Sequence, residues 1–135
     1  MQEDADIPPL TSRFISPRLI GILGALAFIT GITLAILSGW LWPHSGHLAA
    51  AIVILGVVVG LLNITGREVI PFLIAGVALV VIGQGDVFKP LNDLVADLGT
   101  IVDGVVTQIA LFAAPAALVN AIRVAVALGR PTREP

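Results

Sequence analysis

Long apolar runs separated by short polar segments dominate the pattern of this chain. The first run, residues 19–42, carries no charged side chain, and as a helix it would be about 36 Å long at 1.5 Å per residue. A membrane core of about 30 Å takes roughly 20 apolar residues, so this run predicts a membrane-spanning helix. It is longer than the apolar region of a cleavable signal peptide, which has about 7–15 residues.

Three further apolar runs are long enough to cross a membrane, the first two of them narrowly. These are residues 48–65, 69–84 and 104–123. We therefore predict an all-α integral membrane protein, with a four-helix transmembrane domain at residues 19–128 between a polar segment, 1–18, and a short tail, 129–135. Three spans with a buried re-entrant segment would be the alternative, but that topology would place the C-terminal arginines outside.

Residues 91–102 differ from these runs because their apolar positions recur with helical spacing. The apolar positions lie within roughly 120° of one another at about 100° per residue. They are Leu91, Leu94, Val95, Leu98, Ile101 and Val102. This pattern predicts an amphipathic helix at the membrane surface or against the other spans. Its polar face carries Asp93 and Asp97, whereas helices drawn to anionic lipid carry Lys and Arg, so contact with protein or with the outer leaflet is favoured.

The composition of the chain supports the membrane assignment. Apolar residues make up 57% of the chain and charged residues 12%, with a mean hydropathy of +1.04, whereas about a quarter of the residues in soluble domains are charged. The absence of cysteine excludes disulfides, thiolate nucleophiles and iron–sulfur clusters. A net charge of −2 argues against a nucleic-acid partner, which needs a basic surface. The expected partner is the lipid bilayer.

Basic residues divide unevenly between the two faces of a membrane that this chain would cross four times. One face would hold Arg13, Arg18, Arg67, Arg123, Arg130 and Arg133, and the other face would hold Lys89. Cytoplasmic segments carry the excess of Lys and Arg in membrane proteins. We therefore expect a multi-pass protein of the cell membrane with both termini in the cytoplasm.

The polar stretch NITGRE, residues 63–68, separates two apolar runs and has the signals of a tight turn. Thr65 and Glu68 have the spacing of a capping box, in which a hydroxyl and a carboxylate accept from free N–H groups at a helix start. Gly66 or Asn63 could end the preceding helix, and Arg67 can lie among lipid phosphates. We expect a capped cytoplasmic hairpin. The functional alternative is a site for an ion or a partner chain at Arg67 and Glu68.

Two segments, GLLNITGREVIPFLIAGVALVVIG and IALFAAPAALVNAIR, resemble a group of small, largely uncharacterised prokaryotic membrane proteins. Those proteins carry a hairpin of the form GLLN-(I/V)-T-x-x-E-x-x-PFL-(I/V)-A and a last helix with an AAPAAL-like run. The resemblance covers roughly residues 57–123. It implies a fold of membrane helices and no established activity, and it marks several residues as family features without assigning them a role. These are Asn63, Thr65, Glu68, Pro71 and Pro115.

Small residues recur at four-residue spacing in three of the predicted spans. Such stripes let helix backbones approach closely in lipid, where no hydrophobic drive brings helices together. The positions are Ala27, Gly31, Ala35 and Gly39 in the first span, Gly56 and Gly60 in the second, and Ala113, Ala117 and Ala121 in the last. We expect these residues to pack helices together, within the monomer or between subunits.

Few side chains indicate chemistry. His44 and His47 lie in one turn beside two tryptophans, and without a Cys or acidic neighbour they are expected to be solvated; a metal or pigment site would need several copies of the chain. No ionisable residue lies well inside a predicted span, and Arg123 is close enough to the cytoplasmic edge to reach lipid phosphates or a partner. We therefore predict no catalytic residue, no metal site and no cofactor.

The function that the sequence favours is a non-catalytic one. The chain would be a structural or accessory subunit that packs into a homo-oligomer or a larger membrane complex. A small oligomeric channel or transporter for ions or small solutes is the alternative. Thr107, Gln108, Asn120 and the broken segment GQGD, residues 83–86, would then line its path, since a pore needs polar groups around an axis. A membrane enzyme is least favoured because no nucleophile or acid–base pair has a useful spacing.

Overall fold

The computed structural model describes residues 16–62 and 68–131, and in these ranges the regular structure is helical, without strands. The helices are α1 (Pro17–Leu41), α2 (Gly46–Leu62), α3 (Val69–Gln84), the short 3₁₀ helix η2 (Lys89–Asp93) and α4 (Leu98–Leu128). The all-α prediction is therefore confirmed. Two helices, α1 and α4, are long and apolar enough to cross a membrane, whereas α2 and α3 are shorter apolar helices.

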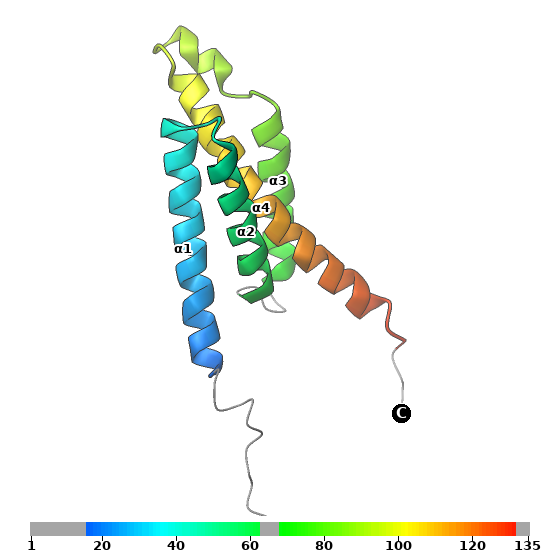
Figure 1. Cartoon of the computed structure of the whole chain (residues 1–135). Helices are drawn as coiled ribbons and strands as arrows, with labels where there is room; N and C mark the ends of the chain where they lie inside the picture. The colour runs from blue at the N-terminus through cyan, green and yellow to red at the C-terminus, as the bar shows by residue number, and fades with distance from the viewer. Residues whose placement is uncertain (1–15, 63–67, 132–135) are drawn as a thin grey trace, which may run out of the picture.

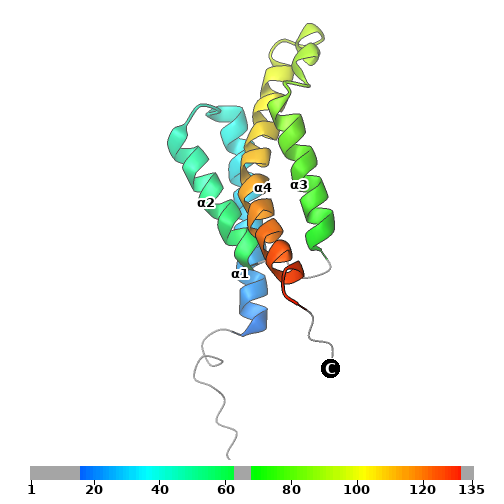
Figure 2. The ribbon, with the colours of Figure 1, turned by 90° about the vertical axis from the view of Figure 1, so that its right-hand side faces the viewer.

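The last helix, α4, is the centre of the arrangement. It packs against α1, α2 and α3, and α1 and α2 also pack against each other. Within the described part of the chain, α4 is the one long helix that α3 contacts. Figures 1 and 2 show α4 running between the other helices, with its last turns leaning away from α1.

Local signals explain where α1 begins and ends. The Ser16 side chain accepts a hydrogen bond from the backbone N–H of Leu19 at 3.3 Å, and Pro17 occupies the first helical position, where its missing N–H is not needed. The helix ends at Leu41, because Trp42 precedes Pro43 and a residue before proline is pushed out of the helical conformation. The predicted span at residues 19–42 thus corresponds to α1.

The core is small and centres on one aromatic side chain of α4. Phe112 is 1% exposed, its ring centroid lies 5.9 Å from that of Phe28, and it belongs to a buried cluster with Ala35, Ile52 and Val59. Most other large apolar side chains of the described helices remain on the outside. Only 17% of the apolar window of α1 and 33% of that of α4 is buried, so most of each window stays exposed or partly exposed.

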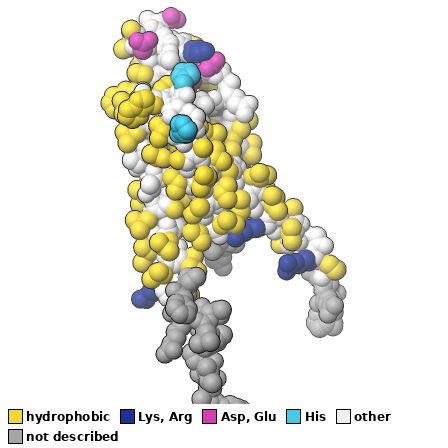
Figure 3. All heavy atoms as spheres, viewed as in Figure 1, with side chains coloured by type: hydrophobic (Ala, Val, Ile, Leu, Met, Phe, Trp, Pro, Cys, Tyr) yellow, Lys and Arg dark blue, Asp and Glu magenta, His cyan; other side chains and the backbone are white. Residues whose placement is uncertain are grey.

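Apolar and charged side chains occupy different zones of the surface. In Figure 3, apolar side chains cover the middle of the visible face, acidic and histidine side chains gather at the upper end, and basic side chains lie mainly at the lower end. Large contiguous apolar patches are rare on soluble monomers and mark contacts with other proteins or with a membrane. The zones match a membrane protein whose polar ends meet water.

The prediction of a separate amphipathic helix at residues 91–102 is wrong. The segment is divided between η2, an irregular turn and the first turns of α4. Asp97 has a left-handed backbone with φ 67°, which interrupts any continuous helix at this point. The apolar side chains on both sides of the break are not buried as one face either, since Leu94 is 79% exposed and Val95 is 57% exposed.

The other predicted spans differ from the helices mainly at their ends. Residues 69–84 coincide with α3, and residues 104–123 lie inside the longer helix α4, which takes in part of the segment predicted to be amphipathic. The predicted span 48–65 corresponds to α2, which ends at Leu62; residues 63–65 lie outside the described residues.

Candidate functional site

The best candidate site is a polar cleft at the end of the bundle where α4 begins. Its volume is about 230 Å³, and it lies where the turn between α1 and α2 approaches the segment after α3. The residues that line it are Pro43, His44, Asp86, Lys89, Thr100, Asp103, Gly104, Thr107 and Gln108. Its lining holds more polar side chains than the hollows between α3 and α4 or the hollow on the last turns of α4.

Two buried side chains of α4 form the floor of this cleft. Asp103 is 8% exposed and accepts a hydrogen bond at Oδ1 from the backbone N–H of Phe88 at 3.0 Å. Gln108 is 5% exposed, and its Nε2 donates to the backbone carbonyl of Pro43 at 3.2 Å. The second oxygens, Asp103 Oδ2 and Gln108 Oε1, have no hydrogen-bond partner among the described residues. They retain the capacity to accept from water, a hydroxyl or an amine.

An ion pair lies at the rim of the cleft. Lys89 Nζ donates to Asp86 Oδ2 at 2.7 Å, and both side chains are more than half exposed. The hydrogen bond to Asp86 and its negative charge raise the pKa of Lys89 above its ordinary value of 10.5. An exposed pair of this kind is screened by water and contributes little to stability.

The two histidines are placed differently. His44 lines the cleft, whereas His47, on the first turn of α2, is not part of its lining. Both are exposed. Within residues 16–62 and 68–131, no three His, Cys, Asp or Glu side chains come close enough together to hold a metal ion.

A side chain that the sequence analysis did not consider stabilises the start of α4. Asn92 accepts a hydrogen bond at Oδ1 from the backbone N–H of Thr100 at 3.1 Å, and its Nδ2 donates to Thr100 Oγ1 at 2.9 Å. This bond satisfies one of the free N–H groups in the first turn of α4. Asp97, the residue before the helix, makes no capping hydrogen bond with its side chain. Asp103, one residue beyond the 91–102 segment, is buried in the second turn of the same helix. Neither position has a local sequence signal.

At the opposite end of the molecule, α4 holds the last turn of α2. The Arg123 guanidinium donates to the backbone carbonyls of Gly60 at 3.3 Å and Leu61 at 3.0 Å. Asn120 is 1% exposed, and its Nδ2 donates to the carbonyls of Ala116 at 2.8 Å and Gly60 at 3.3 Å. The Gly60 and Leu61 carbonyls lie in the last turn of α2, where carbonyls have no partner within the helix, so these donors satisfy them. Arg123 therefore has a structural contact in addition to any contact with lipid or a partner.

The predicted hairpin cap lies mostly outside the described residues. Asn63, Thr65 and Arg67 are in that group. Glu68 immediately precedes α3, with a helical backbone, and its side chain makes no capping hydrogen bond. It thus stands at the N-cap position rather than at the third helical position that a capping box would assign to it.

The small-residue stripes lie mainly where α1 and α2 face α4. A Cβ atom built on Gly39 would lie 2.5 Å from Val105 Cα, and one built on Gly60 would lie 2.9 Å from Ala116 Cα. Gly31 packs closely against the ring of Phe112, and Gly56 packs closely against the backbone carbonyl of the same residue. The other members differ in burial: Ala35, Ala113 and Ala117 are buried, Ala27 packs on the core cluster, and Ala121 is exposed.

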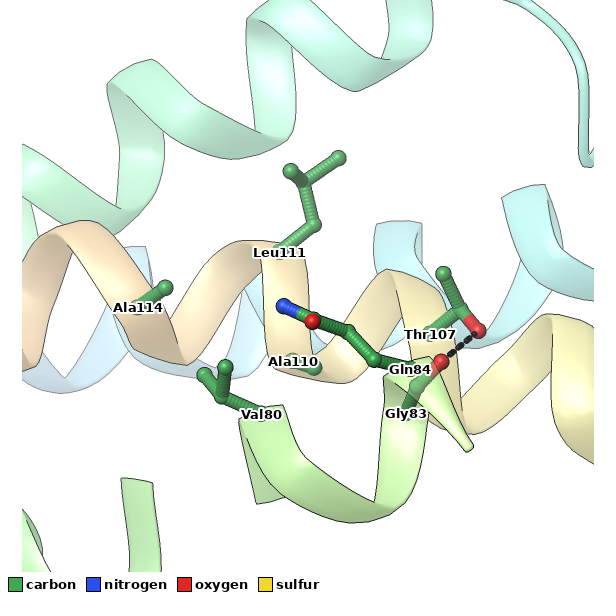
Figure 4. A pocket seen from close by; sticks show the side chains of 7 residues that line it. All are labelled: Val80, Gly83, Gln84, Thr107, Ala110, Leu111 and Ala114. Carbon is green, nitrogen blue, oxygen red and sulfur yellow. Dashed lines mark hydrogen bonds between the residues drawn. The ribbon is translucent and has the colours of Figure 1, made fainter. Parts of the chain in front are cut away.

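A second, mostly apolar hollow lies between α3 and α4. It has a volume of about 160 Å³, and Figure 4 shows the side chains around it, with Gln84 lying over α4 near Ala110. The Thr107 hydroxyl donates to the backbone carbonyl of Gly83 at 2.8 Å, which joins the two helices. The hollow contains no nucleophile or acid–base pair, so it offers packing space rather than chemistry.

Comparison of the chain with protein-family models, with curated proteins and with solved structures finds no match.

Proposed function

We propose that this chain is a non-catalytic integral membrane protein that crosses the membrane four times and serves as a structural or accessory subunit in a homo-oligomer or a larger membrane complex. The observation that carries the proposal is the division of the face seen in Figure 3 into a polar acidic end, an apolar middle and a basic end. An apolar middle of this kind is stable in lipid and unstable in water.

The helix lengths are compatible with four spans. At about 1.5 Å per residue, α1 with 25 residues is roughly 37 Å long and α4 with 31 residues is roughly 46 Å long. α2 with 17 residues and α3 with 16 are roughly 25 Å long, about 5 Å shorter than an average hydrocarbon core. Local thinning of the bilayer accommodates such a difference at a modest free-energy cost.

The distribution of basic residues supports a cytoplasmic location for both termini. Arg18 lies in the first turn of α1, and Arg123 and Arg130 lie near the end of α4; Figure 1 shows these two helix ends toward the same, lower end of the molecule. Lys89 lies at the other end, where it pairs with Asp86. The positive-inside rule assigns the arginine-rich end to the cytoplasm.

The contacts of the polar side chains within α4 favour a packing role over a channel. Thr107, Gln108 and Asn120 each donate to a backbone carbonyl of a neighbouring segment. Those segments are α3, the turn after α1, and α2, so the three side chains point in different directions instead of sharing one path. In lipid such hydrogen bonds hold helices together. α3 meanwhile keeps most of its surface available to lipid or to a neighbouring subunit.

Topology can be tested with single cysteines because the natural chain has none. Asp93→Cys and Gly129→Cys place a thiol at the two ends of the molecule, both at exposed positions. With a membrane-impermeant maleimide on intact cells, we expect labelling of the Asp93→Cys variant and labelling of the Gly129→Cys variant only after permeabilisation. Equal labelling of both in intact cells would contradict the four-span topology.

The subunit role requires a measurement of composition. After gentle detergent extraction, native mass spectrometry should find the chain in a closed homo-oligomer or together with defined other subunits. Other subunits in the particle would favour the accessory role over an autonomous channel. A bare monomer under these conditions would contradict the assembly role.

A further inference from the structure

We propose that Arg123 and Arg130 form a binding site for the phosphate of one anionic phospholipid on the last turns of α4. The inference rests on the proposed membrane position of the chain. Its starting point is a hollow of about 430 Å³ whose described lining combines two arginines with three apolar side chains. These residues are Ile122, Arg123, Val126, Ala127 and Arg130.

The spacing of these residues places the two arginines on one face. Positions 123, 126, 127 and 130 follow the i, i+3, i+4, i+7 pattern of a helix face. Gly129, after the end of α4, keeps near-helical angles of φ −77° and ψ −8°, so Arg130 continues this spacing. Two turns separate the arginines by roughly 11 Å along the axis, and both long side chains can converge on a phosphate placed between them.

Arg123 is already held in position. Its two terminal nitrogens donate to the carbonyls of Gly60 and Leu61. A guanidinium has five N–H donors, so others remain for a phosphate. Because the side chain is anchored on α2, it loses little further freedom when a ligand binds.

The apolar part of the hollow favours a lipid over a free phosphate. Val126 and Ala127 lie between the arginines on the helix, and Val126 and Ile122 are more than half exposed. The glycerol and first methylenes of an acyl chain can cover these side chains, which a free phosphate leaves bare. Charge complementarity favours an anionic headgroup, since a zwitterionic one would bring its own cation toward the arginines.

The test is lipid retention measured by native mass spectrometry on the full chain in detergent. Phosphatidylglycerol and phosphatidylcholine with the same acyl chains are added in turn to the wild type, to Arg130→Gln and to Arg18→Gln. Arg18→Gln is the matched control because it removes the same charge at the same end of the molecule, on α1. Arg123→Lys serves as a second variant that keeps the charge but loses the forked geometry.

We expect the wild type and Arg18→Gln to retain one phosphatidylglycerol, with apparent binding at least tenfold weaker for Arg130→Gln and several-fold weaker for Arg123→Lys. Equal retention by Arg130→Gln and Arg18→Gln would overturn the site. So would equal retention of the two lipids, or displacement of the lipid by soluble glycerol phosphate at the same concentration. If the chain retains neither lipid and remains monodisperse without detergent, the proposed membrane function fails as well.

Discussion

The close approach of α1 and α4 at Gly39 leads to a prediction whose size can be worked from the structure. A Cβ on this residue would lie 2.5 Å from Val105 Cα, 2.6 Å from the carbonyl oxygen of Gly104 and 2.7 Å from its carbonyl carbon. Ordinary contacts of a Cβ begin at 3.4 Å. The obstructing atoms belong to the backbone and cannot rotate away, so Gly39→Ala requires the two helices to separate by about 1 Å, the difference between 3.4 and 2.5 Å.

Gly21→Ala is the matched control on the same helix, since a Cβ at Gly21 has no atom within 4 Å. Both substitutions replace Gly by Ala in a helix and gain about 0.8–1 kcal/mol of helix propensity, which cancels in the comparison. Overpacking of a tight contact costs about 1–3 kcal/mol. Gly39→Ala is therefore expected to lie about 1–3 kcal/mol below Gly21→Ala in free energy of unfolding, which is about 5- to 150-fold in the equilibrium constant.

The assay is unfolding in mixed micelles with an increasing fraction of SDS. Far-UV circular dichroism follows loss of helix, and fluorescence reports from Trp40 and Trp42, the two tryptophans of the chain, which lie next to the contact. The Gly39→Ala midpoint should lie below wild type, and the Gly21→Ala midpoint at or above it. If the two variants unfold at the same SDS fraction, the close approach of α1 and α4 is refuted.

Two further predictions concern polar side chains at the two ends of the molecule. Asn120→Asp should abolish stable folding, because it buries a negative charge against the carbonyls to which Asn120 now donates. Asn120→Leu removes both the donor and the unpaired oxygen, so it should shift the melting midpoint in detergent only slightly. Equal midpoints for the two variants would contradict the buried position. At the other end, the folded pKa of Lys89 is raised, so its contribution to stability is present below pH 10.5 and is lost as the pH rises through the folded pKa. Asp86→Asn should lower the pKa of Lys89 and remove this loss of stability at alkaline pH. The Cε signal of Lys89 in ¹³C NMR measures the pKa of this side chain directly, because the chain has no other lysine and contains no tyrosine or cysteine that would titrate in the same pH range.

The sequence predicts those parts of the fold that are determined by residues close together in the chain. The span at 69–84 could be placed because a continuous apolar run begins and ends where α3 does. The amphipathic pattern at 91–102 is present in the sequence, but spacing alone could not show that Asp97 adopts a left-handed backbone there. Periodicity predicts which face a residue would occupy in a helix, and it cannot show where that helix is interrupted.

The polar cleft could not be predicted because the contacts that build it join distant parts of the chain. Gln108 bonds to Pro43 across 65 positions, and Asp103 bonds to Phe88 across 15. An aspartate that lies on the polar side of a helical pattern is ordinarily solvated, and only the fold of the preceding loop buries this one. The small-residue stripes could be found from spacing, but their partner helix could not.

The central position of α4 also has a consequence for the order of events during synthesis. Among the described helices α4 is the last to be made, yet it is the one that all the others contact. When α3 leaves the ribosome, the helix it packs on does not yet exist, and until then α1 and α2 have only each other. In the proposed four-span topology, α3 therefore has no packing partner within the chain until α4 is made, and assembly of the bundle is completed in one late step, when α4 packs between the earlier helices.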